Sequence, residues 1–384
     1  MKIVHICLAA RYVEGFGYQE NIIPQIHKNM GNEVLILTSE YEIDQYYKTK
    51  KRKNSDYVND FGIRVKSLKK SDSGFFSRFG IYADLNEALE DFSPNIIFVH
   101  GGQFFSLKDV VKYCKGHKGV KMYIDQHADY YNSPVDAWKR KMCQRYIYGT
   151  WMRKAIRYTS KFWGVTPWRC DYLHDVYKIP KDKIDLLVMG GDDRYIRFDK
   201  QNEIWENVRN KLNISESDFV IISGGKINKD KNIHLLMQAV LDLHIENLKL
   251  IVFGQPLEDI KEEFYKLLKN ESIIYINWIK SEDVYDYFLA SDLAVFPGTH
   301  SVLWEQAVAC GRPTVFKDWQ GMHHVDVGGN CVFLKEDSVD EIKKTISEIY
   351  ENREMYDNMK KTATEKGIKE FSYSNIARKA IELI

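Results

Sequence analysis

Residues 221–233 of this 384-residue chain read Ile221-Ile222-Ser223-Gly224-Gly225-Lys226-Ile227-Asn228-Lys229-Asp230-Lys231-Asn232-Ile233. The apolar start predicts a buried strand, and a helix is expected from Asn232 to about Leu243. Glycines let the backbone approach a ligand closely, and the helix N-terminus directs amide groups at an anion. Because Lys226 and Lys231 add positive charge, the segment has the features of a phosphate-binding turn. A solvated basic turn is the alternative, and the spacing of a Walker loop is absent.

Short apolar runs alternate with helical patterns along the whole chain, which is typical of βαβ units and parallel sheets. The expected strands are 2–8, 33–38, 63–67, 96–100, 121–125, 161–165, 184–188, 219–223, 249–253, 273–276, 293–296 and 314–316. The pattern restarts near residues 193–202, and one core rarely serves so long a chain. We therefore expect an α/β protein with two doubly wound, Rossmann-like domains and an active site in the cleft between them. The polar, lysine-rich stretch 48–70 reads mostly as a mobile loop.

Composition narrows the class of protein. A net charge of +1 gives no argument for nucleic acid as a partner. The six cysteines form no Cys-x-x-Cys pair, so buried thiols in a reducing compartment are expected, with neither disulfides nor a zinc knuckle. The N-terminus reads as a strand and not as a signal peptide, and no apolar run is long enough to span a bilayer. These features predict a soluble, cytoplasmic protein.

A second informative segment runs Ala294-Val295-Phe296-Pro297-Gly298-Thr299-His300-Ser301-Val302-Leu303-Trp304-Glu305-Gln306-Ala307-Val308-Ala309-Cys310-Gly311-Arg312-Pro313-Thr314-Val315. A strand ends at Pro297, a polar loop follows, and a helix of small residues ends near Gly311. Glu305 is a lone carboxylate in an otherwise apolar helix. A buried acid needs partners, and the hydroxyls of a ribose would serve. Backbone amides are the structural alternative.

Together these segments resemble the donor domain of the family-4 retaining glycosyltransferases (glycosyl transferases group 1), which adopt the GT-B fold. In that family a glycine and a basic residue, followed by a Lys-Asn or Lys-Gly pair, bind the donor diphosphate; Gly225, Lys226 and Lys231-Asn232 match this pattern. The family's Pro-Ser … Glu-Ala-x-Ala-x-Gly-x-Pro-Val stretch is matched by Pro297 and by residues 305–315. The resemblance implies that Lys226 and Lys231 stabilise the departing diphosphate and that Glu305 holds the ribose.

The resemblance extends over nearly the whole chain. Trp278 and Ile279 are similar to the family's short loop whose backbone reads the nucleobase. Gly15, Phe16 and Gly17 stand where the family has a glycine-rich loop facing donor and acceptor, and His127 follows a strand as the family's active-site histidine does. A last helix, opened near residue 371, crosses back to the first domain in this fold. The implied domains are 1–195 with 371–384 for the acceptor, and 196–370 for the donor.

The sequence departs from the family at one motif. The family pairs two glutamates eight positions apart, whereas Pro297 stands eight positions before Glu305 (305 − 8 = 297). His300, Ser301 and Val302 lie in the altered loop and are assigned to the donor site, with contacts to sugar or phosphate. The departure leaves two alternatives open: a nucleotide- or glycan-binding protein without catalysis, and a sugar-nucleotide epimerase on the same fold.

Histidines at strand ends and a basic aromatic stretch complete the candidate residues. His127, near Asp125 and Asp129, is read as a group that donates to the sugar or stabilises the reacting centre, while a core role is equally open for His100. Residues 138–161 contain eight Lys or Arg, five Trp or Tyr and no acid. They could lie on an anionic membrane or form an ordinary amphipathic helix.

The expected activity follows from the resemblance. It is transfer of a sugar from a nucleoside-diphosphate sugar, with retention, to a glycan or lipid-linked acceptor in polysaccharide or glycoconjugate synthesis. No metal or other cofactor is expected, because the lysines and the helix N-terminus already neutralise the diphosphate. The expected location is the cytoplasm, and the inner face of the membrane is the alternative.

Overall fold

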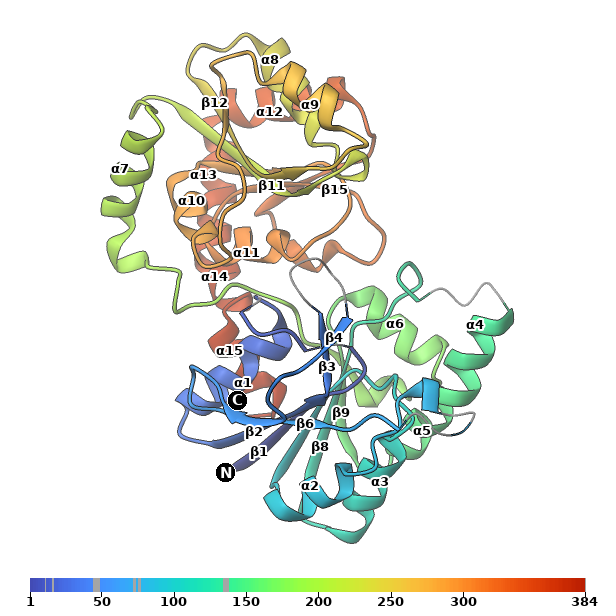
Figure 1. Ribbon diagram of the computed structural model, residues 1–384. Coiled ribbons are helices and arrows are strands. Elements are labelled where there is room, and N and C mark those ends of the chain that lie inside the picture. Colours follow the sequence, from blue (N-terminus) through green and yellow to red (C-terminus); the bar gives the residue numbers. More distant parts are fainter. Residues whose placement is uncertain are drawn as a thin grey trace. The chain divides into compact units, whose positions relative to one another are not determined.

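The computed structural model describes residues 1–10, 12–15, 17–43, 49–71, 74, 77–133 and 138–383, without the side chains of Ile43, Lys139 and Arg140. These residues form two compact units (Figure 1). The N-terminal unit comprises Met1–Val188 and the chain from Ile376 onward, and the C-terminal unit comprises Met189–Asn375. From the sequence we expect the chain to pass from one domain to the other after residue 195 and to return after residue 370. Among the described helices, none combines the length and the apolar character needed to cross a bilayer.

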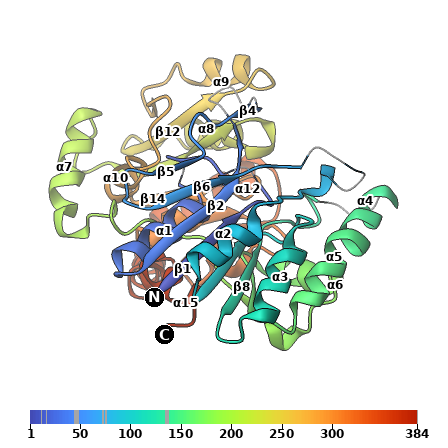
Figure 2. The same cartoon turned by 60° about the horizontal axis from the view of Figure 1, so that its bottom comes forward.

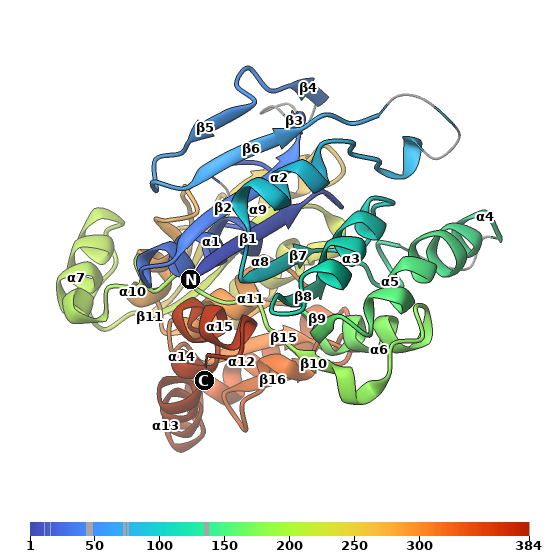
Figure 3. The ribbon, with the colours of Figure 1, turned by 90° about the horizontal axis from the view of Figure 1, so that it is seen from below.

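The N-terminal unit is built on a twisted sheet whose described strands run in the order β10-β9-β8-β7-β1-β2-β6-β5 (Figure 3). All neighbouring strands in it are parallel except β5 and β6. A separate antiparallel pair, β3 and β4, stands beside it. The strands are β1 Lys2–Cys7, β2 Glu33–Ser39, β3 Tyr41–Ile43, β4 Thr49–Lys51, β5 Asp56–Val58, β6 Arg64–Leu68, β7 Ile96–His100, β8 Lys121–Gln126, β9 Thr159–Gly164 and β10 Ile184–Leu186.

Helices cover both faces of this sheet, because successive strand residues point to opposite sides. From β1, Val4 and Ile6 pack with the apolar residues of α2 (Leu85–Phe92), α3 (Leu107–Gly116) and α5 (Gly149–Ala155). His5 points to the other face, toward α1 (Gln19–Asn29). The helix α15 (Tyr373–Ala380) lies beside α1 on that face, and Figure 2 shows both ends of the described chain close together there.

The C-terminal unit has a fully parallel sheet of order β13-β12-β11-β14-β15-β16. Its strands are β11 Phe219–Ile227, β12 Leu248–Pro256, β13 Ile273–Tyr275, β14 Leu293–Phe296, β15 Thr314–Lys317 and β16 Cys331–Leu334. One face packs against α8 (Ile233–Leu243), α9 (Lys261–Leu267), α12 (Val339–Glu351) and α13 (Arg353–Thr362). The remaining helices of the unit are α7 (Gln201–Lys211), α10 (Val284–Ala290), α11 (Leu303–Ala309) and the short α14 (Ile368–Glu370).

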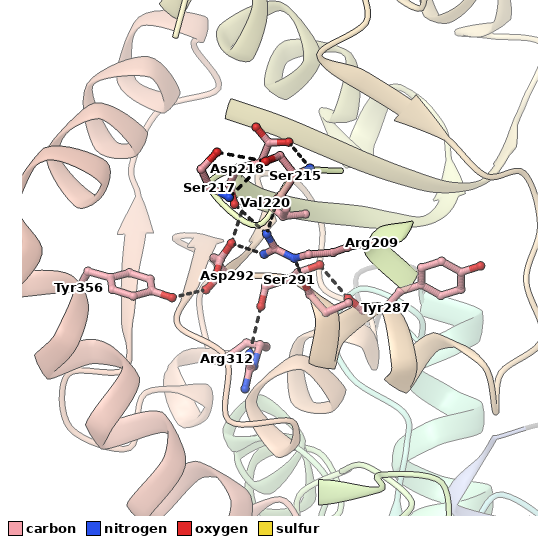
Figure 4. Close-up of polar contacts among 11 residues, drawn as sticks. Arg209, Ser215, Ser217, Asp218, Val220, Tyr287, Ser291, Asp292, Arg312 and Tyr356 are labelled. Atoms are coloured by element: carbon pink, nitrogen blue, oxygen red, sulfur yellow. Dashed lines mark hydrogen bonds and ion pairs between the residues drawn. The ribbon is translucent and has the colours of Figure 1, made fainter. Parts of the chain in front are cut away.

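An ion pair between the buried Arg209 and the half-buried Asp292 fastens α7 to the amino ends of two central strands (Figure 4). Arg209, which is 3 % exposed, donates to Oδ2 of Asp292 at 2.8 Å and to the carbonyl of Ala290 at 3.1 Å. The same Asp292 oxygen accepts from the Val220 amide at 2.8 Å. The Tyr356 hydroxyl donates to the Asp292 carbonyl at 3.2 Å. This cluster stabilises the sheet at the edge opposite to the turn that follows β11.

The fold class expected from the sequence is confirmed: each unit is a Rossmann-like α/β layer structure. Every predicted strand overlaps an observed one. The strand β16 was not predicted, because it has four residues and three of them are only half-buried. The loop predicted for 48–70 was partly wrong, since β4 and β5 lie within it. Both are short and largely exposed, so they lack the apolar pattern of buried strands.

The basic aromatic stretch 138–161 is helical from Trp138 to Ala155. It contains α4 (Trp138–Met142), a π-helical turn at Cys143–Tyr148 and α5, and it ends inside β9. Its aromatic residues divide: Trp138 and Tyr146 are 73 % and 60 % exposed, whereas Tyr148 and Trp151 pack against the core. Part of its aromatic content is therefore ordinary packing.

Candidate functional site

The two segments singled out in the sequence follow β11 and β14, which are neighbours at the centre of the C-terminal sheet. The strand order reverses between them, and doubly wound sheets bind ligands at such points. The two loops touch through their backbones: the Thr299 amide donates to the Asp230 carbonyl at 2.9 Å. A Cβ added to Gly298 would lie 2.3 Å from that carbonyl oxygen. Only glycine fits at this crossing.

The turn after β11 begins while the strand is still paired with β12. Gly225 has a φ of +108°, in the region that L side chains rarely adopt. A Cβ there would also lie 2.8 Å from a methyl carbon of Leu303. Lys226 follows with an exposed side chain at the carboxyl edge of the sheet. The strand therefore ends in a tight turn that presents an exposed lysine.

Lys231 and Asn232 join the turn to the loop after β14. The Lys231 ammonium donates to the carbonyl oxygens of Thr299 at 2.5 Å and His300 at 3.0 Å. Burial lowers the pKa of Lys231 to about 8. Asn232 has a left-handed φ of 54° before α8, and its amide donates to the Pro297 carbonyl at 3.2 Å. These contacts place one cation, partly desolvated, between the two segments.

Glu305 is fully buried in the first turn of α11. Its Oε1 accepts from Nε2 of His300 at 2.8 Å and from Nε2 of His324 at 2.9 Å. Its Oε2 is also buried and has no hydrogen-bond partner among the described residues. Burial alone would raise the pKa of Glu305, but the two histidines hold it well below its ordinary value. Glu305 is therefore a carboxylate with one oxygen satisfied and one open.

The group His300, Glu305 and His324 has the donor types of a zinc site, and its ligand atoms lie within 4.8 Å of one another. Nε2 of His300 and Nε2 of His324 are both at hydrogen-bond distance from Oε1 of Glu305. These two hydrogen bonds are enough to hold the three side chains together. The expectation that the donor site works without metal stays a prediction.

The other predicted donor residues lie in the loops that follow β13 and β14. Ser301 and Val302 are half-buried, and Val302 precedes α11 directly. Trp278 is 68 % exposed and Ile279 half-buried in the loop after β13. That loop is held to β12, because the Gly254 amide donates to the Asn277 carbonyl at 2.7 Å. Its backbone is thus anchored at the same carboxyl edge of the sheet.

In the N-terminal unit, His127 lies at the carboxyl end of β8. Its side chain is 37 % exposed, and Nε2 is 3.2 Å from Oδ2 of the buried Asp125. Burial alone would lower the pKa of His127, but the Asp125 carboxylate raises it above the ordinary value. Asp129, two positions on, pairs with Arg169 at 3.1 Å. His127 is the partly exposed end of a buried polar chain.

The predicted glycine-rich loop is described in part. Gly15 is exposed with a φ of +80°, Gly17 is half-buried, and Phe16 lies outside the described residues. A cavity of about 410 Å³ opens at the carboxyl ends of β1 and β2. Its lining carries two cations, polar groups and aromatic rings, among them Lys70, Arg78, Gln103, Phe79, Tyr82 and Tyr148. Such a lining suits a polar, anionic ligand.

Sequence reasoning missed several members of these sites. His324 is 19 positions from Glu305 and lies in an irregular segment, so nothing in the sequence links the two. Asp125 was noted only as a neighbour of His127, although it is fully buried and bonds His100 at 2.9 Å. The sequence does show a polar residue inside an apolar strand, and such a residue needs a hydrogen-bond partner. It does not show which residue that partner is.

Comparison with known proteins supports the fold over the whole chain. A glycosyltransferase from Rickettsia africae superposes with a TM-score of 0.71 at 14 % identity, over 100 % of this chain and 97 % of that one. The Anabaena protein HepE, crystallised with UDP, gives 0.73 at 15 % identity, over 100 % and 99 %. A UDP-GlcNAc 2-epimerase from Neisseria meningitidis gives 0.59 at 14 % identity, over 100 % and 99 %. The fold is that of the GT-B proteins, and it serves more than one reaction.

Sequence relatives match shorter parts. An alpha-monoglucosyldiacylglycerol synthase of Streptococcus pneumoniae is 24 % identical over 155 residues, 38 % of this chain and 35 % of that protein. The matched part of the chain spans 35 %, 43 % and 52 % of the length of three curated relatives and 16 % of a fourth. Residues 205–366 match the family model of the glycosyl transferases group 1. The chain thus has the GT-B fold, and the part that holds Lys231 and Glu305 is similar to the group 1 glycosyltransferases.

Proposed function

We propose that this protein is a retaining, metal-independent glycosyltransferase. It transfers a sugar from a nucleoside-diphosphate sugar to a glycan or lipid-linked acceptor, in the synthesis of a cell-surface polysaccharide or glycoconjugate. The proposal rests on the group 1 match of the C-terminal unit and on the geometry at the ends of β11 and β14.

Glu305 is the observation that carries the proposal. A buried acceptor without a partner costs about 1–3 kcal/mol, and a ribose hydroxyl that donates to Oε2 would remove that cost. His300 and His324 hold Oε1, so the carboxylate cannot turn away from the site. Glu305 would therefore fix the ribose, and with it the position of the diphosphate.

The diphosphate would lie between the two loops. Lys231 stands there with its ammonium group, Lys226 is exposed on the adjoining strand, and α8 begins directly after Asn232. These groups would stabilise the negative charge that develops on the diphosphate as the glycosidic bond breaks. That assignment gives the lysines the role that a divalent cation has in other phosphate sites.

The acceptor would bind to the N-terminal unit, near Gly15, Gly17 and His127. The cavity of about 410 Å³ offers Lys70 and Arg78 to an anionic acceptor and aromatic rings to a sugar. The name of the Streptococcus relative gives a glucosylated lipid as its product, and HepE was crystallised with UDP-glucose. These names favour a UDP-sugar donor and a lipid-linked acceptor in the first assays. Contact of residues 138–161 with the inner membrane surface, from the cytoplasm, would fit such an acceptor.

Turnover of UDP-glucose with and without candidate acceptors tests the proposal. A transferase forms a glycosylated product only with acceptor, keeps the anomeric configuration of the donor, and is unaffected by EDTA. An epimerase changes the sugar nucleotide without acceptor, and a binding protein does neither. Either of the last two results, once nucleotide binding is established, would overturn the assignment.

A further inference from the structure

Three histidines form a buried hydrogen-bonded chain behind Asp125. Nε2 of His27 is 2.8 Å from the carbonyl oxygen of Ala377. Nδ1 of His27 is 3.0 Å from Nε2 of His5, and Nδ1 of His5 is 3.0 Å from Nε2 of His100. Nδ1 of His100 is 2.9 Å from Oδ2 of Asp125. The chain thus runs from α1 and α15 through β1 and β7 to β8, and His127 lies at its far end.

The number of protons in this chain follows from its two ends. A backbone carbonyl can only accept, and so can a carboxylate. Four hydrogen bonds join the two ends, and each requires one proton. Three neutral imidazole rings supply three. The fourth proton must therefore be a second proton on one ring, or a proton on Asp125.

Asp125 is the less suitable place for it. Its Oδ1 already accepts from the Gly101 amide at 2.9 Å, and its Oδ2 faces His100 and His127. Burial alone would raise the pKa of Asp125, but the charges of His127 and His100 and their hydrogen bonds hold it well below its ordinary value. The carboxylate is therefore ionised, and one of the rings carries two protons.

Among the rings, His100 is the one beside the carboxylate. His5 and His27 are fully buried, and no carboxylate of the described residues contacts either ring. Burial lowers the pKa of His27 to about 4 and that of His5 well below its ordinary value. An imidazolium paired with Asp125 avoids an uncompensated buried charge. The direction of the hydrogen bonds leads to the same ring. When His27 and His5 are neutral, each donates toward Ala377 and accepts from the next ring, so His100 must donate from both of its nitrogens.

We propose that His27, His5 and His100 are positioning residues that hold an extra proton on His100, and that this imidazolium neutralises Asp125 and thereby sets the proton affinity of His127. Without the imidazolium of His100, the Asp125 carboxylate would act on His127 alone and hold a proton on the His127 ring. Among the described residues, the other charged groups that act on His127 are Glu20 on α1, which raises its pKa, and Arg169 in α6 (Pro167–Asp175), which lowers it. The Cys7 thiol near Asp125 stays uncharged, because burial raises its pKa.

The direct test counts protons on ring nitrogens in the full chain. Histidine labelled with ¹⁵N is followed by NMR from pH 6 to 8.5, and single substitutions assign the signals. We expect four N–H protons on the three rings, two of them on His100, over the whole range. Three protons, one for each ring, would place the fourth on Asp125 and overturn the proposal. A ring nitrogen of His100 that gains its proton only after chelation of metal would overturn it as well.

The second test perturbs the chain at its far end. In His27→Phe, His5 can reverse its tautomer and donate to His100, so that two neutral rings satisfy both remaining hydrogen bonds. His100 then loses its extra proton, and the midpoint of the His127 titration should rise by about one to two pH units. The matched control is His117→Phe, which removes a half-buried histidine of the same unit outside the chain.

An unchanged His127 midpoint in folded His27→Phe would refute the proposal, and so would an equal shift in His117→Phe. If His27→Phe does not fold, the proton count in the natural chain decides alone. Both readouts are independent of sugar transfer, so the inference fails or holds separately from the proposed function.

Discussion

Nε2 of His324 lies 2.9 Å from Oε1 of Glu305, while Oε2 of the same carboxylate is buried without a described partner. The asymmetry distinguishes a structural acid, which would have both oxygens satisfied, from one that is held ready for a ligand. It leads to a prediction about the ribose hydroxyls of the donor.

Glu305→Gln should weaken binding of the nucleoside diphosphate by roughly 10- to 100-fold, because a hydrogen bond to a charged group is worth about 1.5–3 kcal/mol. The natural protein should lose a similar amount with the 2′,3′-dideoxy nucleotide, and the variant should not discriminate between the two. Calorimetric titration measures all four combinations. If Glu305→Gln still prefers the intact ribose, Glu305 does not hold it. Glu258→Gln, on the surface, is the matched control.

Affinity for the diphosphate should fall as the pH rises above about 8. The pKa of Lys231 is lowered to about 8 from the ordinary 10.5, so the free protein loses this positive charge above that pH. A diphosphate binds the ammonium form, and the fall should approach tenfold for each pH unit. Lys231→Arg stays charged, so its affinity should be flat over the same range. A fall of equal slope in Lys231→Arg would show that another group titrates.

The lowered pKa of Lys231 also makes the free energy of unfolding depend on pH. Between pH 8 and 10.5 the unfolded chain binds the Lys231 proton and the folded chain does not, so Lys231 makes the free energy of unfolding rise with pH in that window. Urea denaturation at pH 8 and pH 10 should show a larger rise in the natural protein than in Lys231→Met. Equal rises would mean that Lys231 is not desolvated.

Gly298→Ala should disrupt the donor site, because the new Cβ would lie 2.3 Å from the Asp230 carbonyl oxygen and 2.4 Å from the carbonyl carbon of Lys231. The two loops must move apart, at a cost of about 1–3 kcal/mol, and Lys231 moves with them. Thermal unfolding and nucleotide titration should both reveal the change. Gly119→Ala, which meets nothing within 4 Å, should leave both unchanged. Full nucleotide affinity in Gly298→Ala would contradict the loop contact.

Arg209→Leu should destabilise the C-terminal unit by about 1–3 kcal/mol, since it leaves the Asp292 carboxylate, which is 25 % exposed, and the Ala290 carbonyl without their donor. Arg353→Leu breaks a pair on α13 whose arginine is 76 % exposed, and it should change stability by less than about 0.5 kcal/mol. Urea denaturation compares the two. Equal effects would mean that the buried cluster does not fasten α7.

The sequence predicted the sheets better than the sites. Parallel strands buried on both faces read as apolar runs, so the cores of β11, β12 and β14 were visible without a structure. The strands β4 and β5 are exposed and polar, and their pairing depends on neighbours that local sequence does not show. Edge elements of this kind were missed for that reason.

Members of the candidate site could be proposed from the sequence where a local motif contains them. Lys231 and Glu305 lie in stretches whose order is itself informative. The contacts of Glu305 with His324, and of His5 with His27 and His100, join residues from separate elements, 19 to 95 positions apart. A histidine inside the apolar run Ile3–Cys7 signals a buried partner, but only the packing of α1, β1 and β7 shows which partner it has.

The central claim is that the C-terminal unit binds a nucleoside diphosphate through Lys231 and Glu305. The most direct measurement is thermal unfolding of the natural protein, Lys231→Ala and Glu305→Ala with UDP, GDP, ADP and CMP. At about a hundred times the dissociation constant, binding stabilises the fold by roughly 2.7 kcal/mol. The account predicts that one diphosphate raises the midpoint of the natural protein by several degrees and leaves both variants unchanged. No shift with any nucleotide, or an equal shift in the variants, would contradict it.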